Sequence, residues 1–342
     1  MKAVVFTTHG GPEVLEYAEA PDPAIKANEV LVEVKACALN HLDVWARGGL
    51  PGIDIPLPHI LGNDIAGVVR EVGELVSWVR TGDEVMLQPG VSCGHCFECL
   101  AGRDNLCRDY DMLGYRRDGG YAQLVAAPAV NVIPKPKNLS WEEAAALPLV
   151  TVTAWHMLVT RAAVQPGEDV LIHAAGSGVG SIGIQVAKLR GARVIATASS
   201  DEKLVKAKEL GADEVVNYTS NDWPKEVKRL TNRKGVEVVF EHTGAATWPG
   251  SIASLKSNGR LVTCGATSGF AAQTDIRQIF YRHLTILGSF MGSKSELLEA
   301  MKFIENGKIR AVVDQILPLA EARRAHELME DRAQFGKLVL VP

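Results

Sequence analysis

The fold of this chain is decided by residues 169–183, which read Asp169-Val-Leu-Ile-His-Ala-Ala-Gly-Ser-Gly-Val-Gly-Ser-Ile-Gly183. The apolar start predicts a strand, and residues 184–190 predict a helix. A glycine-rich turn between a strand and a helix lets the backbone approach a pyrophosphate at the helix N-terminus. Alone, such a run more often forms an ordinary tight turn. Because both flanking elements are present, we predict a dinucleotide-binding turn made of Gly176, Ser177, Gly178, Val179 and Gly180.

Outward from this turn, the two halves of the chain show different periodicities. Apolar runs at 193–197, 236–240, 260–264 and 284–288 follow the first strand in a series with helical stretches, which predicts a parallel sheet of five or six strands. Residues 1 to about 130 instead show short alternating apolar runs broken by Gly and Pro, which is typical of a β-rich domain. Residues 335–341 predict one more strand. The expected fold class is α/β, with a doubly wound parallel sheet plus a β-rich domain.

The residues after the second strand of the series bear on which dinucleotide is bound. An acidic side chain there accepts hydrogen bonds from the adenosine ribose and repels a 2′-phosphate. Here the strand is followed by small hydroxyl residues, Ser199 and Ser200, and Lys203 lies within reach of a phosphate. The sequence therefore favours NADP(H) over NAD(H), although NAD(H) stays open. The alternative is that Lys203 is a solvated helix residue and that Asp201 only caps the helix.

Length, composition and charge limit the classes of function. A chain of 342 residues with 47% hydrophobic residues can bury two cores. The net charge is −4 and no lysine-rich or arginine-rich run occurs, so nucleic acid is not an expected partner. We find no signal peptide and no segment long and apolar enough for a membrane span, so we expect a cytoplasmic protein without a membrane partner.

Four of the six cysteines fall within residues 93–107. Their spacing, C-x2-C-x2-C-x7-C, allows four thiolates to close a tetrahedron around Zn²⁺. Because protein fills all four positions, such a zinc stabilises a loop and leaves no place for substrate. We predict one structural zinc per chain, held by Cys93, Cys96, Cys99 and Cys107; free or paired surface thiols are the alternative.

Together these features resemble the medium-chain dehydrogenase/reductase family, which includes alcohol dehydrogenases and quinone oxidoreductases. The resemblance covers essentially the whole chain, including Gly119-Gly-Tyr-Ala122 and residues 145–155. It implies a GroES-like catalytic domain at 1–135 and 295–342 with a zinc lobe at about 90–110, and a Rossmann domain at 136–294. It also implies a small-molecule substrate in the cleft between the domains and a homodimer or homotetramer. The nicotinamide half of the cofactor is expected at Gly265, Gly288, Ser289 and Phe290.

The chain departs from the family where alcohol dehydrogenases bind a second, catalytic zinc. The resemblance places the first ligand position on Asn40, the histidine position on Asn63 and the late position near Leu149. Asn and Leu offer no thiolate or imidazole, so we expect no tight catalytic zinc. In this respect the chain is similar to quinone oxidoreductases. A different metal site made of His41, Asp43 and Asp64 stays open, although such residues at a helix start more often form a cap.

The expected absence of a catalytic zinc limits the chemical class of substrate that the protein can reduce. Reduction of a plain ketone needs an electrophile for the developing alkoxide, whereas a conjugated C=C bond or a quinone spreads the charge onto an enolate-like oxygen. We therefore predict NADPH-dependent reduction of an enone, an enoyl thioester or a quinone. The candidate catalytic residues are Asn40 and Asn63 as hydrogen-bond donors, His41 as proton donor, and Asp64. Structural alternatives are that Asn63 caps the turn after Gly62 and that Asp64 pairs with a cation.

Two other functions remain open from the sequence. One is a zinc-type alcohol or aldehyde dehydrogenase, and the other is a non-catalytic NADPH-binding protein. Metal content and turnover distinguish them.

Overall fold

The computed structural model describes residues 1–50 and 52–342, which form two compact units. The first unit contains Met1–Leu149, Ser293–Leu297 and Arg310–Pro342, and the second contains Val150–Gly292 and Leu298–Ile309. Both ends of the chain thus belong to one unit. The division differs from the expected bounds, because residues 136–149 and 293–294 join the first unit and residues 298–309 join the second.

The first unit is built on a seven-stranded sheet. Its strands are β3 (Glu29–Ala38), β5 (Asp64–Val72), β6 (Glu84–Leu87), β9 (Leu124–Pro128), β10 (Val132–Pro134), β17 (Val313–Pro318) and β18 (Lys337–Val341). They run in the order β10-β6-β5-β3-β18-β17, and β9 also pairs with β3. Strand β3 buries Val30, Val32 and Val34 because alternate side chains point to one face. The C-terminal strand β18 pairs antiparallel with β3, through Val339 and Ala38.

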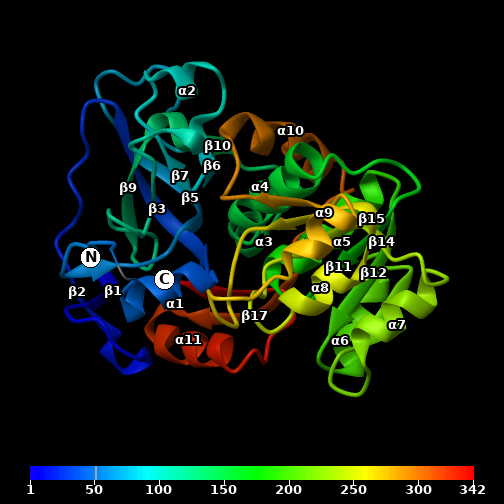
Figure 1. Cartoon of the computed structure of the whole chain (residues 1–342). Coiled ribbons are helices and arrows are strands. Elements are labelled where there is room, and N and C mark those ends of the chain that lie inside the picture. The colour runs from blue at the N-terminus through cyan, green and yellow to red at the C-terminus, as the bar shows by residue number, and fades with distance from the viewer. Residues whose placement is uncertain (51) are drawn as a thin grey trace. The chain divides into compact units, whose positions relative to one another are not determined.

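Smaller elements complete the first unit. A three-stranded sheet contains β1 (Lys2–Phe6), β2 (Glu16–Glu19) and β4 (His59–Ile60), and a hairpin contains β7 (Gly90–Val91) and β8 (Asp111–Met112). The helices are α1 (His41–Gly48), α2 (Phe97–Leu100), α3 (Trp141–Ala145) and α11 (Ala322–Glu330), while α4 (Pro148–Trp155) crosses the division between the units. Helix α11, drawn in red, packs beside the blue α1, so segments from opposite ends of the chain are neighbours (Figure 1).

The second unit is a doubly wound α/β unit. Its strands are β11 (Asp169–Ile172), β12 (Arg193–Ala198), β13 (Glu214–Asn217), β14 (Val236–Glu241), β15 (Leu255–Thr263) and β16 (Thr285–Gly288). All pairings are parallel, in the order β13-β12-β11-β14-β15-β16, and Figure 1 shows the helices packed around this sheet. The helices are α5 (Gly178–Leu189), α6 (Asp201–Glu209), α7 (Trp223–Leu230), α8 (Trp248–Ser254), α9 (Ile276–Tyr281) and α10 (Lys294–Glu305), of which α10 starts in the first unit.

The predicted α/β class is therefore confirmed, and the sheet has a defined switch point. From β11 the chain winds outward to β12 and β13, and then returns to β14 on the other side of β11. In such sheets ligands bind at the carboxyl ends of the strands, where the order reverses. We call the side of the sheet formed by these carboxyl ends the C-terminal edge.

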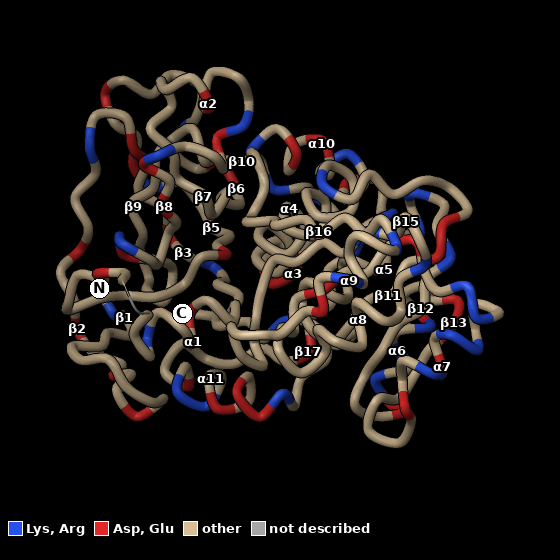
Figure 2. The backbone as a smooth tube through the Cα atoms, in the orientation of Figure 1, with Lys and Arg blue, Asp and Glu red and all other residues tan. Residues whose placement is uncertain are grey.

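Charged residues of both signs are interspersed along the backbone (Figure 2), in keeping with 36 basic and 40 acidic residues. Within residues 1–50 and 52–342, no helix combines the length and the apolar character that crossing a bilayer requires.

Candidate functional site

The glycine-rich turn joins the end of β11 to the capped start of helix α5. Ser177 caps helix α5, because its Oγ accepts a hydrogen bond of 2.8 Å from the amide of Gly180. The amides of Gly178 and Val179 have no carbonyl to bond within the helix, since they belong to its first turn. A Cβ on Gly180 would collide with the carbonyl oxygen of Ala174, so a side chain there would deform the turn. The predicted residues Gly176–Gly180 thus form one backbone cradle at the end of β11.

A further glycine fixes how α5 packs on the sheet. A Cβ on Gly183 would lie 3.2 Å from the ring of Phe240, which is tighter than ordinary packing. The absence of a side chain lets the helix lie close against β14, as the third glycine of a dinucleotide fingerprint does.

The residues predicted to select the dinucleotide lie at the end of the neighbouring strand β12. Ser200 is the N-cap of α6, with its Oγ 3.4 Å from the amide of Lys203, so the cap is Ser200 and not Asp201. Asp201 instead accepts a hydrogen bond of 2.8 Å from Asn217 Nδ2. The carbonyl of Ser199 accepts from the Thr219 hydroxyl at 3.2 Å.

The residues expected near the nicotinamide half follow β15 and β16 on the same C-terminal edge. Gly265 lies beside the end of β14, where an added Cβ would be 3.1 Å from the carbonyl oxygen of His242. The carbonyl of Gly288 accepts 2.8 Å from Arg161 Nε, and Ser289 donates its amide 2.8 Å to Thr263. Phe290 is 56% exposed. The structure therefore brings the predicted cofactor residues to one edge of one sheet.

A buried polar cluster in the first unit contains two of the predicted catalytic residues and one that the sequence reasoning missed. Lys337 Nζ lies 2.6 Å from Asn40 Oδ1 and 2.9 Å from Asp64 Oδ2. Asn40 Nδ2 donates to the same Asp64 oxygen at 2.9 Å, and the amide of Leu149 donates to the other at 2.8 Å. Asp64 is fully buried and Lys337 is 3% exposed. We call Asn40, Asp64 and Lys337 the ammonium cluster.

The other two predicted catalytic residues, Asn63 and His41, have contacts of their own. Asn63 is fully buried, and its Nδ2 donates across to the carbonyl of Leu113, so it does not cap the turn after Gly62. Among the described residues, its Oδ1 has no hydrogen-bond partner. His41 is the first residue of α1 and packs edge-on against Trp45, with ring centroids 5.0 Å apart.

Asp43 ties the start of α1 to the Gly62 loop. Its carboxylate accepts 2.7 Å from the amide of Asn40 and 3.2 Å from the amide of Gly62. Burial raises the pKa of Asp43 to about 7. Since its oxygens face donors, Asp43 acts as cap and hydrogen-bond partner rather than as a metal ligand.

A catalytic zinc does not fit this donor set. The expected ligand positions hold two carboxamides and an alkyl side chain, and zinc in proteins is bound by thiolate, imidazole or carboxylate. The one carboxylate nearby, Asp64, is already paired with an ammonium group. Among the described residues, the only grouping of side chains able to hold a metal is the cysteine cluster.

A structural zinc does fit the cysteine cluster. The four Sγ atoms lie within 4.8 Å of one another, with Cys93 to Cys99 at 3.9 Å and Cys96 to Cys99 at 3.5 Å. Metal–sulfur bonds of about 2.3 Å place tetrahedral sulfurs roughly 3.8 Å apart. Hydrogen bonds from the backbone at His95 and Cys96 lower the pKa of Cys93 to about 6, which favours the thiolate that a metal needs.

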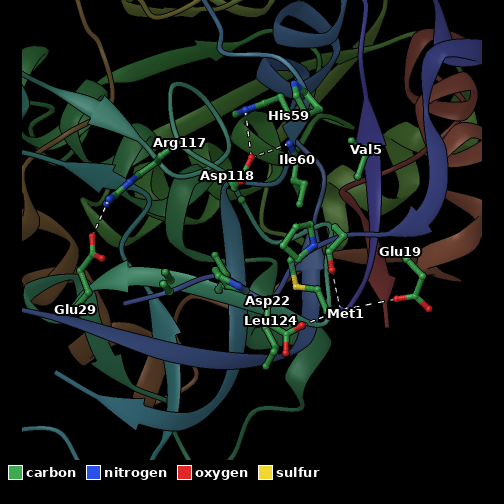
Figure 3. Close-up of a pocket in the computed structure, with 18 of the residues that line it drawn as sticks. Met1, Val5, Glu19, Asp22, Glu29, His59, Ile60, Arg117, Asp118 and Leu124 are labelled. Carbon is green, nitrogen blue, oxygen red and sulfur yellow. Dashed lines mark hydrogen bonds and ion pairs between the residues drawn. The ribbon is translucent and has the colours of Figure 1, made fainter. Parts of the chain in front are cut away.

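A separate pocket of about 550 Å³ in the first unit does not contain the predicted catalytic residues. Two ion pairs lie in its wall (Figure 3): the Met1 ammonium lies 2.7 Å from Asp22, and Arg117 lies 2.8 Å from Glu29. The Met1–Asp22 pair ties the first residue of the chain to the wall of the pocket.

Comparisons with known proteins find one protein family that matches the first unit and one that matches mainly the second. Residues 26–137 match the family described as an alcohol dehydrogenase GroES-like domain, and residues 178–306 match the family described as zinc-binding dehydrogenase.

Individual relatives carry two kinds of name. A zinc-type alcohol dehydrogenase-like protein of Schizosaccharomyces pombe is 36% identical, over 96% of this chain and 94% of its own length. Quinone oxidoreductase 1 of Escherichia coli is 32% identical, over 99% of each chain. A crystal structure of an NAD-dependent alcohol dehydrogenase is 54% identical over 100% of both chains, with a TM-score of 0.97.

Proposed function

The chain belongs to the medium-chain dehydrogenase/reductase family of oxidoreductases, and from this premise we propose that it passes a hydride from NADPH to an activated C=C bond or a quinone without a catalytic zinc. The family and the cysteine cluster support a nicotinamide cofactor and a structural zinc. The choice of NADPH, the substrate class and the absence of a catalytic zinc are the parts that we propose.

The observation that carries the proposal is the position of the Lys337 ammonium group. It lies between Asn40, at the expected first-ligand position, and Asp64, next to the expected histidine position. Two unit charges 4 Å apart repel by roughly 4 kcal/mol at the effective dielectric constant of a protein. A metal cation at this place would therefore meet a cation already in position and amide ligands that bind zinc poorly.

The ammonium cluster suits the stabilisation of an enolate-like oxygen. An ammonium group has three N–H donors and a carboxamide nitrogen has two. Two of the three Lys337 donors are accounted for by Asn40 and Asp64. A preorganised donor of this kind stabilises charge that develops in the transition state. We infer that Lys337 is the main electrophile, that Asn40 helps it, and that Asp64 positions both.

NADPH is proposed on the residues that follow β12. Ser199 and Ser200 place hydroxyl groups, and no carboxylate, directly after the strand, while Asp201 is turned to Asn217. This arrangement does not repel a 2′-phosphate as an acidic residue would.

An assay of metal content and substrate range tests the proposal. We expect purified protein to contain about one zinc per chain by elemental analysis. We also expect it to oxidise NADPH in preference to NADH with a quinone or an α,β-unsaturated ketone, and to reduce a simple aldehyde far more slowly. Two zinc ions per chain together with aldehyde reduction would refute the proposal.

A second candidate function is an NAD-dependent alcohol dehydrogenase. It is favoured by the printed name of the solved structure that is 54% identical to this chain. Oxidation of a primary alcohol with NAD⁺ at a higher kcat/KM than any reduction of a quinone or enone would favour this candidate.

We also propose that the protein is a homodimer that pairs through β16. This strand ends the parallel sheet, and helix α9 just before it has no buried residue. Phe280 is 62% exposed and Tyr281 is 83% exposed. An edge strand offers unpaired backbone groups to a second copy, and a two-fold axis pairs the same surface with itself.

Lysine at both Phe280 and Tyr281 is expected to convert the dimer to a monomer in size-exclusion chromatography with light scattering, because buried aromatic anchors each contribute about 2 kcal/mol or more. Val205→Lys is a matched control, since Val205 is 59% exposed on α6 of the same unit and should leave the dimer intact. An unchanged mass for the double variant would show that this surface is not the interface.

A further inference from the structure

Four buried side chains form a continuous hydrogen-bonded chain across the C-terminal edge of the second unit. Thr197 Oγ1 lies 3.2 Å from His173 Nδ1, His173 Nε2 lies 2.9 Å from Ser251 Oγ, and Ser251 Oγ donates 2.6 Å to Glu241 Oε2. Each of the four residues is at most 1% exposed. We call this set the switch-point chain.

The direction of every hydrogen bond in the chain follows from chemistry. A carboxylate only accepts, so Ser251 donates to Glu241 and must accept from His173 Nε2–H. Burial lowers the pKa of His173 to about 4, so the ring is neutral and Nδ1 is an acceptor. The Thr197 hydroxyl therefore donates to Nδ1. The ring has one tautomer, and each polar atom in the chain is satisfied.

The chain joins the segments that the dinucleotide site requires. His173 follows β11 and begins the glycine-rich turn. Thr197 is the next-to-last residue of β12, and Glu241 is the last residue of β14. The backbone adds to the link, because the amide of Ala175 donates 2.8 Å to the carbonyl of Thr197. Strands β11 and β14 flank the switch point, so the chain spans the place where a ligand binds.

At one end of the switch-point chain, Glu241 fixes the loop after β14. Glu241 Oε1 accepts 2.7 Å from the amide of Thr243 and 3.1 Å from the amide of Gly244. His242 Nε2 lies 2.9 Å from the carbonyl of His173, and its own carbonyl is beside Gly265. The glycine-rich turn, the end of β12 and the nicotinamide-side residues are thereby held in one frame.

We propose that His173 is a positioning residue for nicotinamide cofactor binding, which acts by holding the ends of β11, β12 and β14 in register through the switch-point chain. The inference rests on the proposed function in that it requires a nicotinamide cofactor on this edge. His173 itself is buried and does not touch the cofactor; its effect passes through Thr197 on one side and Glu241 on the other.

The test is the variant His173→Phe. It keeps an aromatic ring against Trp223, whose ring centroid lies 4.7 Å from that of His173, and it removes the hydrogen bonds to Thr197 and Ser251. The dissociation constant for NADPH, measured by fluorescence titration, is expected to rise about tenfold. This corresponds to a loss of about 1.4 kcal/mol of binding free energy when the switch-point chain is interrupted. The KM for cofactor should rise by the same factor, whereas kcat at saturating cofactor and the KM for the second substrate stay within about twofold of wild type. His173→Gln, which restores an N–H toward Ser251, is expected to recover part of the affinity.

Thr231→Val is the matched control for a loss of stability alone. Thr231 is a buried threonine of the same unit whose hydroxyl donates 2.9 Å to Val227 and accepts 3.0 Å from the amide of Gly235. It should lower the thermal midpoint without changing NADPH affinity. If wild-type protein binds neither NADPH nor NADH, the proposed function fails. If wild type binds and His173→Phe binds equally tightly, or loses no more affinity than Thr231→Val, the role of His173 is refuted and the proposed function stands.

Discussion

Replacing Cys96 and Cys99 together by serine is expected to abolish zinc binding and to unfold the loop that carries α2. Zinc bound by four thiolates contributes on the order of 10 kcal/mol to the folding of a small zinc site, and two ligands do not hold the metal tightly. Helix α2 has little other support, because Phe97 and Leu100 are more than 70% exposed and no residue of α2 is buried. Elemental analysis should find no zinc, and hydrogen exchange should show lost protection over residues 92–110.

The base of this loop should survive the change. Strands β7 and β8 pair there, and Asn131 Nδ2 donates 2.6 Å to the carbonyl of Gly90, so backbone pairing and a buried amide hold the ends. Cys264→Ser, outside the cluster, is the control and should keep the full zinc content. Retention of zinc by the double variant, or unchanged protection of the loop, would contradict a four-cysteine structural site.

The parts of the molecule that the sequence predicted correctly depend on local patterns. The glycine-rich turn needs only a strand, small residues and a helix within about fifteen positions, and the structure has each of them. The cysteine cluster is equally local, since its ligands span residues 93–107. In both cases the spacing along the chain already fixes which atoms meet in space.

The parts that the sequence did not predict depend on contacts between distant segments. Lys337 is 297 residues from Asn40, and no spacing rule joins them. The available signal was a lysine at the start of the apolar strand Lys337–Val341, because a buried ammonium group requires an anion. The sequence leaves Asp64 open as a catalytic residue or as the partner of a cation, and the structure shows the pairing.

A similar limit applies to the helix start after β12. The residue at the N-cap position depends on where the strand ends, and sequence patterns place such boundaries only to within a few residues. Asp201 and Ser200 both suit an N-cap by residue type. Ser200 has the extended backbone of a cap, with φ −146° and ψ 158°, whereas Asp201 is already the first helical residue.

The ammonium cluster also yields a prediction that separates its structural role from its catalytic one. Lys337→Met is expected to lower the free energy of unfolding by about 3–5 kcal/mol, because it leaves the Asp64 carboxylate buried without its cation. Lys2→Met is the matched control in the same unit: Lys2 is 3.0 Å from Glu19 at the surface, and such a pair contributes at most about 1 kcal/mol. Urea denaturation followed by circular dichroism measures both variants.

The double variant Lys337→Met with Asp64→Asn should regain most of the lost stability, since it removes both charges and keeps a carbonyl oxygen for the amide of Leu149. The new Nδ2 group at position 64 can donate to Asn40 once the Asn40 carboxamide turns its Oδ1 toward it, because that oxygen no longer accepts from Lys337. Its kcat/KM for an enone or quinone is nevertheless expected to stay about 100-fold or more below wild type, the usual effect of losing one donor to a developing oxyanion. Stability and activity would then respond differently to the same pair of residues, which a purely structural ion pair cannot explain. A double variant that is both stable and fully active would show that Lys337 only balances the charge of Asp64 and that another group polarises the substrate oxygen.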